Sequence, residues 1–263
     1  MLRSLFSGIS GLRTNQTMLD VTGNNIANAN TTGFKGTTTV FRENLSQVLT
    51  GAGQPAAAQG GTNPLQIGLG TGVFATSGNF TQGSAQQTGR PTDIMLQGDG
   101  FFVVESDGQP IFTRAGSFSF DANANLVTPS GGFVLDEAGA RITLPAGLAS
   151  FNFGADGVLR GVQADGTRID IATLGVATFA NPGGLERIGD TSFRATANSG
   201  NPVVGGAGVD GRGSILGGAL EMSNVDLAAE FTTLILAQRG FQASSRVITT
   251  SDQVLEELVN IKR

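Results

Sequence analysis

The side chains that could perform chemistry in this chain are carboxylates, because the sequence contains no Cys and no His. Disulfides, Cys/His metal sites, and the Cys–His and Ser–His pairs of nucleophilic catalysis are therefore excluded. Asp93, Asp99 and Glu105 lie near one another in the sequence, and paired carboxylates can act as the acid and base of a glycosidase. Nothing in their spacing distinguishes them from solvated strand ends. We therefore expect no catalytic residues and no enzyme.

Two motifs resemble binding loops but lack the context that such loops need. Residues 206–211 (GAGVDG) match the pattern G-x-G-x-x-G, which binds a dinucleotide only between a strand and the start of a helix. Here the match lies in a Gly-rich loop, so we predict no cofactor. The Asp-Gly pairs lack the fixed nine-residue period of calcium-binding repeats, so we predict hairpin turns and no metal site. These turns are Asp99-Gly100, Asp107-Gly108, Asp156-Gly157 and Asp165-Gly166, with a further turn signal at 182–184.

The composition narrows the partners that the chain can have. Its net charge of −5 argues against nucleic acid, because phosphate binding needs a basic surface. Charged residues make up only 14%, and identical subunits with little charge repel one another less when they pack. No apolar run approaches the ~20 residues that span a bilayer, so we predict no membrane insertion. The first residues do not resemble a secretory signal, so we expect any export to leave the N-terminus uncleaved.

The elements that organise the chain are two predicted helices at its ends. Apolar residues recur there at alternating steps of four and three, a spacing that keeps one stripe of a helix facing a partner. We predict helices over 3–29 and from a capping box at 223–226 almost to Arg263, packed together or against copies of themselves. This self-assembly seam comprises Leu5, Ile9, Leu12, Leu19, Ile26, Leu227, Phe231, Leu234, Phe241, Ile248, Leu255 and Val259.

Glycine and polar residues interrupt these helices at particular places. Gly8 and Gly11 weaken the first helix and also let another backbone approach it closely. Gln238, Ser245 and Asp252 lie in the second seam, where polar residues fix the register or face a wet channel. The first helix should end within 23–36, with Gly33 in a left-handed cap.

The middle of the chain has the pattern of antiparallel strands. Residues 37–50 predict a strand followed by a short helical turn. The composition of 51–64, rich in Gly, Ala, Gln and Pro, predicts a flexible or extended connector, with a hinge at Gly51, Gly53, Gly60 and Gly61. From about 92 to 200, period-two alternation and turn signals predict a β sandwich or barrel, followed by a second Gly-rich connector at 198–213 and a last strand at 218–223.

These elements predict an α+β fold with a discontinuous organisation. Residues 1–45 and 216–263 would form a coiled-coil-like layer of terminal helices. Residues 46–90 would form an extended arm, and residues 91–215 an inserted antiparallel β domain joined through Gly-rich segments.

Both ends of the chain resemble one protein family. The N-terminal stretch 3–41 contains GNNIAN and TTGFK, which are similar to the signature of the bacterial flagellar axial proteins, the rod and hook subunits. The stretches 93–104, 112–131 and 220–263 also resemble this family, and AQRGFQ at 237–242 is more like its hook subunits than its rod subunits. The motif residues are Gly23, Asn24, Asn25, Ile26, Ala27, Asn28, Gly33, Phe34 and Lys35.

The resemblance implies a subunit of a helical tube in the flagellum. The terminal helices would line the inner core, and the β domain would form the outer wall. The implied function is that of the hook, a universal joint that transmits torque from rod to filament, and the alternative is the distal rod, whose usual length this chain has. The implied partners are copies of the chain, the neighbouring rod, hook-cap and hook–filament junction proteins, and the flagellar export apparatus.

A protein of another class is also compatible with parts of the sequence. A secreted β-rich adhesin or polysaccharide-acting enzyme with helical tails would need an exposed aromatic or carboxylate cluster. The chain has no Trp and no Tyr, which counts against sugar stacking. Electron microscopy of the concentrated protein separates the two hypotheses, because tubes favour the axial subunit.

Overall fold

The computed structural model describes residues 2–55 and 60–261, and the chain divides into two compact units. Long helices at both ends and antiparallel strands between them confirm the predicted α+β class. Residues 46–77 of the stretch predicted as an arm belong to the same unit as the helices. Unit 1 is Met1–Ala27, Thr37–Ser77 and Asp226–Arg263, and unit 2 is Asn28–Gly36 and Gly78–Val225.

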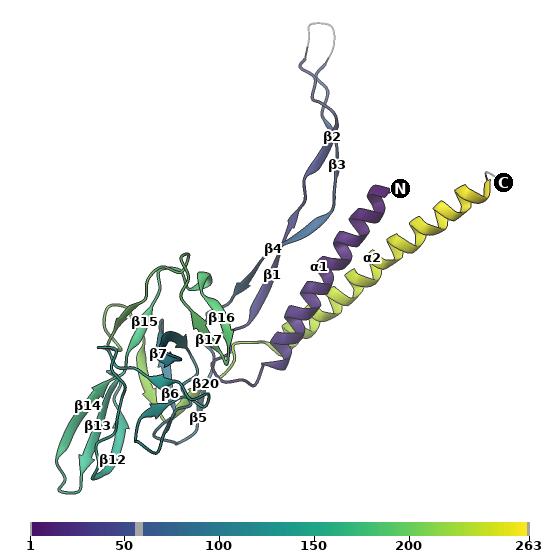
Figure 1. Cartoon of the computed structure of the whole chain (residues 1–263). Coiled ribbons are helices and arrows are strands. Elements are labelled where there is room, and N and C mark those ends of the chain that lie inside the picture. Colours follow the sequence, from purple (N-terminus) through teal and green to yellow (C-terminus); the bar gives the residue numbers. More distant parts are fainter. Residues whose placement is uncertain (1, 56–59, 262–263) are drawn as a thin grey trace. The chain divides into compact units, whose positions relative to one another are not determined.

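Unit 1 is built on α1 (Leu2–Ala27) and α2 (Leu227–Ile261), which lie side by side in opposite directions (Figure 1). The sequence placed the start of α2 three residues too early. Asp226, not Ser223, caps the helix, because its Oδ1 accepts hydrogen bonds from the backbone N–H groups of Ala228 (2.9 Å) and Ala229 (3.4 Å). The left-handed Gly33 (φ +68°) lies beyond the end of α1 and is not its cap.

The other described residues of unit 1 lie mainly in two-stranded ribbons. Strand β1 (Thr37–Glu43) pairs with β4 (Thr71–Gly78), and β2 (Ser46–Thr50) pairs with β3 (Leu65–Gly68). The helical turn expected within 37–50 is therefore wrong, because β-branched residues and strand pairing favour extended backbone there. Gly53 and Thr62 exchange two backbone hydrogen bonds, so the outer parts of the predicted connector continue the hairpin. Residues 56–59 of that connector lie outside the described residues.

Unit 2 contains a nine-stranded antiparallel sheet, a three-stranded sheet and two strand pairs. The strand order of the nine-stranded sheet is β16-β17-β8-β7-β11-β10-β9, and β15 is added to it by pairing with both β7 and β18. The three-stranded sheet has the order β12-β13-β14. The two strand pairs are β19-β6 and β20-β5. The bounds are β5 Ala85–Gln87, β6 Ile94–Gln97, β7 Phe101–Ser106, β8 Gln109–Thr113, β9 Ser119–Phe120, β10 Leu126–Val127, β11 Phe133–Val134, β12 Leu148–Phe153, β13 Val158–Gln163, β14 Arg168–Thr173, β15 Val176–Thr178, the 3-10 turn η1 Pro182–Gly184, β16 Glu186–Gly189, β17 Ser192–Arg194, β18 Val203–Gly205, β19 Ser214–Gly217 and β20 Ala219–Glu221.

Strand β7 is the centre of this unit. Its first four residues are all buried, and side chains alternate between the two faces of a strand. Phe102 and Val104 belong to one apolar cluster, with Phe118, Leu126 and Leu159. Phe101 and Val103 belong to a second cluster on the other face. Unit 2 therefore has an apolar core on each side of β7.

Three of the predicted turns join paired strands. Asp107-Gly108 joins β7 to β8, with both residues at positive φ, as a two-residue hairpin turn requires. Asp156-Gly157 and Asp165-Gly166 join β12, β13 and β14 in succession. The hairpin prediction is wrong at Asp99-Gly100, which joins β6 to β7, because these two strands pair with other strands. Residues 182–184 form the turn η1.

Candidate functional site

The two helices approach each other through small residues. A Cβ added at Gly8 would lie 3.2 Å from Ile248 Cγ1 and 3.5 Å from the backbone oxygen of Ser244. A Cβ at Gly11 would lie 2.9 Å from Ser244 Oγ. Gly8 is buried and Gly11 is half-buried. The close approach expected at these glycines is therefore present, and it occurs between α1 and α2.

The structure divides the predicted seam into two sets. Leu5, Leu12, Leu19, Ile26, Leu234, Phe241, Ile248 and Leu255 are half-buried. Ile9, Leu227, Phe231 and Val259 are exposed, and Val259 keeps 67% of its surface. One intramolecular helix pair thus covers part of the seam and leaves the rest in solvent. The role of the seam in assembly stays a prediction.

A second set of apolar side chains on the helices was not found from the sequence. Phe6 and Leu236 are 67% and 63% exposed, and Ile235, Val247, Val254, Leu258 and Ile261 are exposed as well. Val247, Val254, Leu258 and Ile261 follow one another at seven, four and three residues, which is also a helical repeat. That spacing could have revealed the set from the sequence. The sequence analysis assigned only the four-three seam to helix contacts and left this second repeat out. We call Phe6, Leu236, Val247, Val254, Leu258 and Ile261 the outer stripe.

Asn25 of the GNNIAN motif holds the end of α1 within unit 1. Its Oδ1 accepts a hydrogen bond from the Thr37 backbone N–H (3.0 Å), and its Nδ2 donates to the Thr37 backbone oxygen (2.7 Å) and to Glu230 Oε1 (2.9 Å). Asn25 is buried, so these bonds satisfy an amide that would otherwise be costly to bury. The motif residue therefore ties together α1, β1 and α2.

Other residues of the first motif have smaller structural roles. A Cβ at Gly23 would meet nothing within 4 Å. Ile26 is half-buried and Ala27 is the exposed last residue of α1. Asn28, in unit 2, accepts a hydrogen bond at Oδ1 from Thr31 Oγ1 (3.0 Å). Asn24 lies on α1 and is exposed.

The second motif, TTGFK, is embedded in unit 2. Gly33 has φ +68°, and a Cβ there would lie 2.5 Å from the backbone nitrogen of Ala115, so only glycine fits. Phe34 is buried, and the guanidinium of Arg187 lies 5.1 Å from the centre of its ring. Arg187 also donates a hydrogen bond from Nη2 to the backbone oxygen of Lys35. No local pattern pointed to Arg187, because strand β16 lies far from the motif along the chain.

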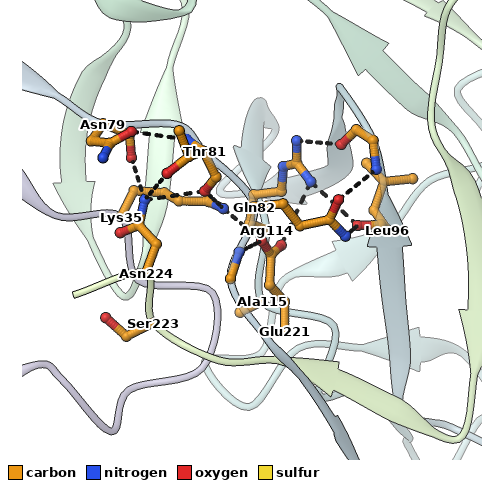
Figure 2. A network of polar contacts seen from close by, with 12 residues as sticks. Lys35, Asn79, Thr81, Gln82, Leu96, Arg114, Ala115, Glu221, Ser223 and Asn224 are labelled. Atoms are coloured by element: carbon orange, nitrogen blue, oxygen red, sulfur yellow. Dashed lines mark hydrogen bonds and ion pairs between the residues drawn. The ribbon is translucent and has the colours of Figure 1, made fainter. Parts of the chain in front are cut away.

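Lys35, the last residue of that motif, belongs to a buried ion network (Figure 2). Its Nζ lies 2.6 Å from Glu221 Oε1 and donates to the backbone oxygen of Thr81 (2.9 Å). Glu221 Oε2 lies 3.5 Å from Arg114 Nη1, which makes an ion pair although the geometry is too poor for a hydrogen bond. Arg114 donates from Nη2 to the backbone oxygen of Gly98 (2.7 Å). The network therefore holds two cations and one anion.

Burial governs the electrostatics of this network. Loss of solvent lowers the pKa of Lys35, and the hydrogen bond and charge of Glu221 oppose that shift without cancelling it. Burial likewise lowers the pKa of Arg114, against the attraction of Glu221 and Asp99. Two cations that are harder to keep charged share one carboxylate, so that carboxylate holds the network together.

Asn224 fastens three segments of unit 2 beside this network (Figure 2). Its Oδ1 accepts a hydrogen bond from the Gly36 backbone N–H (2.8 Å). Its Nδ2 donates to the backbone oxygens of Asn79 (2.9 Å) and Thr81 (3.1 Å). One side chain thus joins the residue after the TTGFK motif, the segment before β5 and the segment after β20.

The three carboxylates considered for catalysis have separate surroundings. Asp93 is buried and its Oδ2 accepts a hydrogen bond from Thr88 Oγ1 (2.6 Å). Glu105 pairs with Arg141, whose hydrogen bond lowers the pKa of that carboxyl. Asp99 is exposed in the turn after β6. Among residues 2–55 and 60–261, no cluster of acidic side chains has the composition of a metal site.

The loop that matches G-x-G-x-x-G is held by its neighbour in sequence. Arg212 donates a hydrogen bond from Nε to the backbone oxygen of Gly206 (2.9 Å) and pairs with Asp210 (2.9 Å). The loop follows β18 and precedes β19, so a strand stands where a dinucleotide site needs a helix. Within the described residues, neither helix has the length and apolarity that a membrane span requires.

Three family models match separate parts of the chain. The model of the flagellar hook protein FlgE/F/G D1 domain matches residues 95–161, within unit 2. The C-terminal model of the flagellar basal body rod FlgEFG protein matches 216–261, which contains α2. The model of the flagella basal body rod protein matches 5–35, which contains most of α1 and both N-terminal motifs.

Relatives match the chain from end to end. The flagellar basal-body rod protein FlgG of Bacillus subtilis is 46% identical over 264 residues, with all of both chains covered. The FlgG protein of Borreliella burgdorferi is 37% identical over 269 residues, and the flagellar hook protein FlgE of the same organism is 29% identical over 441 aligned positions, again with all of both chains covered. The chain therefore belongs to the flagellar rod and hook family of axial structural proteins.

Proposed function

We propose that this chain polymerises into a tubular segment of the flagellar axis through its terminal helices. The observation that carries the proposal is the exposure of large apolar side chains along both helices of unit 1, in the outer stripe and in the uncovered part of the seam. Exposed apolar side chains that recur along one stripe of a helix indicate that a partner covers that stripe. Copies of the same chain are the partner that the family suggests.

The physical basis of assembly is burial that one molecule cannot complete. Each large apolar side chain gains about 1.5–3 kcal/mol when it is fully buried. Copies related head to tail form an open, heterologous contact, and such contacts generate helical filaments. The small share of charged residues keeps the repulsion between crowded copies low.

Two positions along the axis fit this role, and the hook is our first candidate. The residues at 6–8 and at Gly23, together with AQRGFQ at 237–242, resemble hook subunits. In the hook the tube would act as a universal joint that carries torque from rod to filament. The distal rod is the second candidate, because the relatives named FlgG match the chain in length and at higher identity than those named FlgE.

Deleting the gene in its own organism separates these candidates. Loss of a hook subunit leaves completed rods without hooks, whereas loss of a distal rod subunit leaves truncated rods, and electron microscopy of isolated basal bodies distinguishes the two. Electron microscopy of the concentrated purified chain tests the shared part of the proposal. Tubes are the expected result, and a protein that stays monomeric at every concentration would contradict it.

The remaining parts of the proposal concern the flexibility of the tube, its protein partners and its location in the cell. A tube that bends while it rotates needs subunits that yield, and the hinge that we propose for this is Gly51, Gly53, Gly60 and Gly61, because glycine backbone adopts many conformations. Gly53 is held by two backbone hydrogen bonds to Thr62, so bending there would have to break that pair. Replacing Gly51 by Pro should change the bending of the tube more than its assembly.

Neighbouring rod, hook-cap and hook–filament junction proteins would contact the ends of the tube. The subunits would reach the outside of the cell through the flagellar export apparatus, with their N-termini uncleaved.

A further inference from the structure

The chain passes between its two units at four places, which we call the crossing points. They lie at 27/28, 36/37, 77/78 and 225/226. Separate compact units move relative to one another by default, and the residues that connect them absorb the change in backbone angles. How firmly unit 2 holds the chain beside each crossing point therefore limits how freely the two units can move.

Asn224 holds the chain beside three of these crossing points, through partners that belong to unit 2 (Figure 2). It is itself the second-last residue of unit 2 before 225/226. Its Oδ1 accepts a hydrogen bond from the backbone N–H of Gly36 (2.8 Å), the last residue before 36/37. Its Nδ2 donates to the backbone oxygen of Asn79 (2.9 Å), the second residue after 77/78. The backbone N–H of Asn79 also donates to the backbone oxygen of Gly36 (2.7 Å), so three hydrogen bonds close a ring around these crossing points.

An amide suits position 224 because it carries an acceptor and two donors on one planar group. The backbone of Gly36 presents an N–H to it, whereas Asn79 and Thr81 present carbonyl oxygens. Its Nδ2 lies 3.1 Å from both the backbone oxygen and Oγ1 of Thr81. A carboxylate at this position would accept from Gly36 but could donate to neither carbonyl. The amide is therefore matched to all the segments that it joins.

The buried ion network extends this attachment to the remaining crossing point. The backbone oxygen of Thr81 accepts one hydrogen bond from the amide (3.1 Å) and another from Lys35 Nζ (2.9 Å). Lys35 Nζ lies 2.6 Å from Glu221 Oε1, and the backbone N–H of Gly33 donates to the backbone oxygen of Glu221 (2.8 Å). The segment 28–36, which begins at the first crossing point, is thus fixed to unit 2 at two of its residues.

We propose that Asn224 is a positioning residue for the connection between the two units. Its amide clamps three crossing points at one place in unit 2 and so restricts the directions in which unit 1 can extend from it. Without this clamp the connecting segments rotate separately, and the units sample a wider range of orientations. Asn224 is half-buried and lies outside both apolar clusters of unit 2. Loss of its amide should therefore change the relative motion of the units far more than the fold of either.

One consequence of the clamp rests on the proposed function. In a tube whose helices make the contacts between copies, a force on unit 2 reaches the helices through this connection. Tubes of Asn224→Ala should therefore form but bend more easily, with a persistence length at least about twofold shorter in electron micrographs. A persistence length equal to that of the unsubstituted chain would contradict the role of the clamp in the tube.

The dilute monomer tests the clamp itself, whether or not the chain polymerises. Because the chain contains no Cys, Thr232→Cys on α2 and Gln109→Cys on β8, both at exposed positions, place one nitroxide spin label on each unit. Pulsed electron paramagnetic resonance then measures the distribution of distances between the labels. Asn224→Ala is compared with the labelled parent and with Asn125→Ala. Asn125 is a matched control, a half-buried amide of unit 2 that bonds within its own turn to Asp121 Oδ2 (3.0 Å).

The width of the distance distribution decides the inference. We expect Asn224→Ala to broaden it at least about twofold and Asn125→Ala to leave it unchanged, with the same circular dichroism for all variants. Asn224→Asp has nearly the same shape, keeps the acceptor for Gly36 and loses both donors, so it should broaden the distribution by an intermediate amount. A width for Asn224→Ala equal to that of Asn125→Ala would overturn the inference while the proposed function stands. If the unsubstituted chain forms no tube, the proposed function fails, and the monomer still decides the inference.

Discussion

Units 1 and 2 use apolar residues in opposite ways. Unit 2 buries Phe101, Phe102, Val103 and Val104 on both sides of one strand and encloses an ion network beside them. In the described part of unit 1, Ala237 is the one buried apolar side chain, although α1 and α2 are long and rich in apolar residues. A high content of apolar residues therefore does not ensure that a region has a buried core of its own. Unit 2 therefore has a buried apolar core within one chain, whereas the described part of unit 1 does not, and the proposed assembly through unit 1 rests on this difference.

The comparison is tested most strongly in the ion network of unit 2. Replacing Glu221 by Leu leaves Lys35 and Arg114 as two buried cations without an anion. We expect a loss of about 3–5 kcal/mol in the free energy of unfolding, the range for breaking one side of a buried ion pair. Replacing Lys35 by Met leaves Glu221 paired with Arg114, and the loss should be about 1–2 kcal/mol. Urea unfolding, followed by circular dichroism, measures both.

The asymmetry between these two variants is the informative part of that experiment. A network of two cations and one anion depends more on its anion than on either cation. Equal losses for Glu221→Leu and Lys35→Met would show that Arg114 does not compensate, and that the network is a simple Lys35–Glu221 pair.

The second test compares one aromatic residue from each unit. Phe102→Ala removes a fully buried ring from the core of unit 2 and should cost about 3–5 kcal/mol in the free energy of unfolding. Phe231→Ala removes a ring that is 51% exposed on α2 and should change the same quantity by less than about 1 kcal/mol. Thermal unfolding of both monomers makes the comparison. A large loss at Phe231 would mean that unit 1 already has a core of its own.

The third test concerns Asn25, a buried amide that ties α1 to its neighbours in unit 1. Asn25→Ala removes three hydrogen bonds and leaves the backbone groups of Thr37 without their partners. We expect a loss of about 1–3 kcal/mol, seen as faster backbone hydrogen exchange at β1 and at the end of α1. Unchanged exchange at both elements would contradict the role of Asn25 as their anchor.

The fourth test uses pH and acts on unit 2 alone. Burial lowers the pKa of Lys35 in the folded chain below its value in the unfolded chain. Between these two values the unfolded chain binds more protons, so the free energy of unfolding should rise with pH there and should be unaffected by Lys35 below that window. Urea unfolding at a series of alkaline pH values should show this rise, and Lys35→Met should remove it. An identical profile in the variant would contradict the assignment to Lys35.

The sequence predicted best where a local pattern matches a local structure. The four-three spacing of apolar residues located both helices, and Asp-Gly located the turns at 107–108, 156–157 and 165–166, because each pattern acts on neighbouring residues. The start of α2 was misplaced because Ser223 and Asp226 both have the chemistry of a cap, and only the structure selects between them.

What the sequence could not predict depends on residues far apart in the chain. Lys35, Arg114 and Glu221 come from three separate segments, and no spacing indicates that they meet. The same holds for Arg187 against Phe34. The outer stripe is a different case, because its spacing is visible in the sequence. The sequence does not show which of the apolar faces of α2 is covered by α1. That choice depends on the packing at Gly8 and Gly11.

The substitution with the smallest expected effect on the stability of the monomer should have the largest effect on assembly. Leu236 is 63% exposed on α2, so Leu236→Gln, which keeps a good helix former, should change the free energy of unfolding by no more than about 0.5 kcal/mol. If unit 1 is completed by other copies, the same variant should abolish or strongly delay polymerisation, whereas Thr249→Gln, at an exposed polar position of the same helix, should not. Sedimentation at increasing concentration measures both. Polymers of Leu236→Gln at the normal concentration would mean that the outer stripe stays in solvent, and only the exposed part of the seam would remain as a contact between copies.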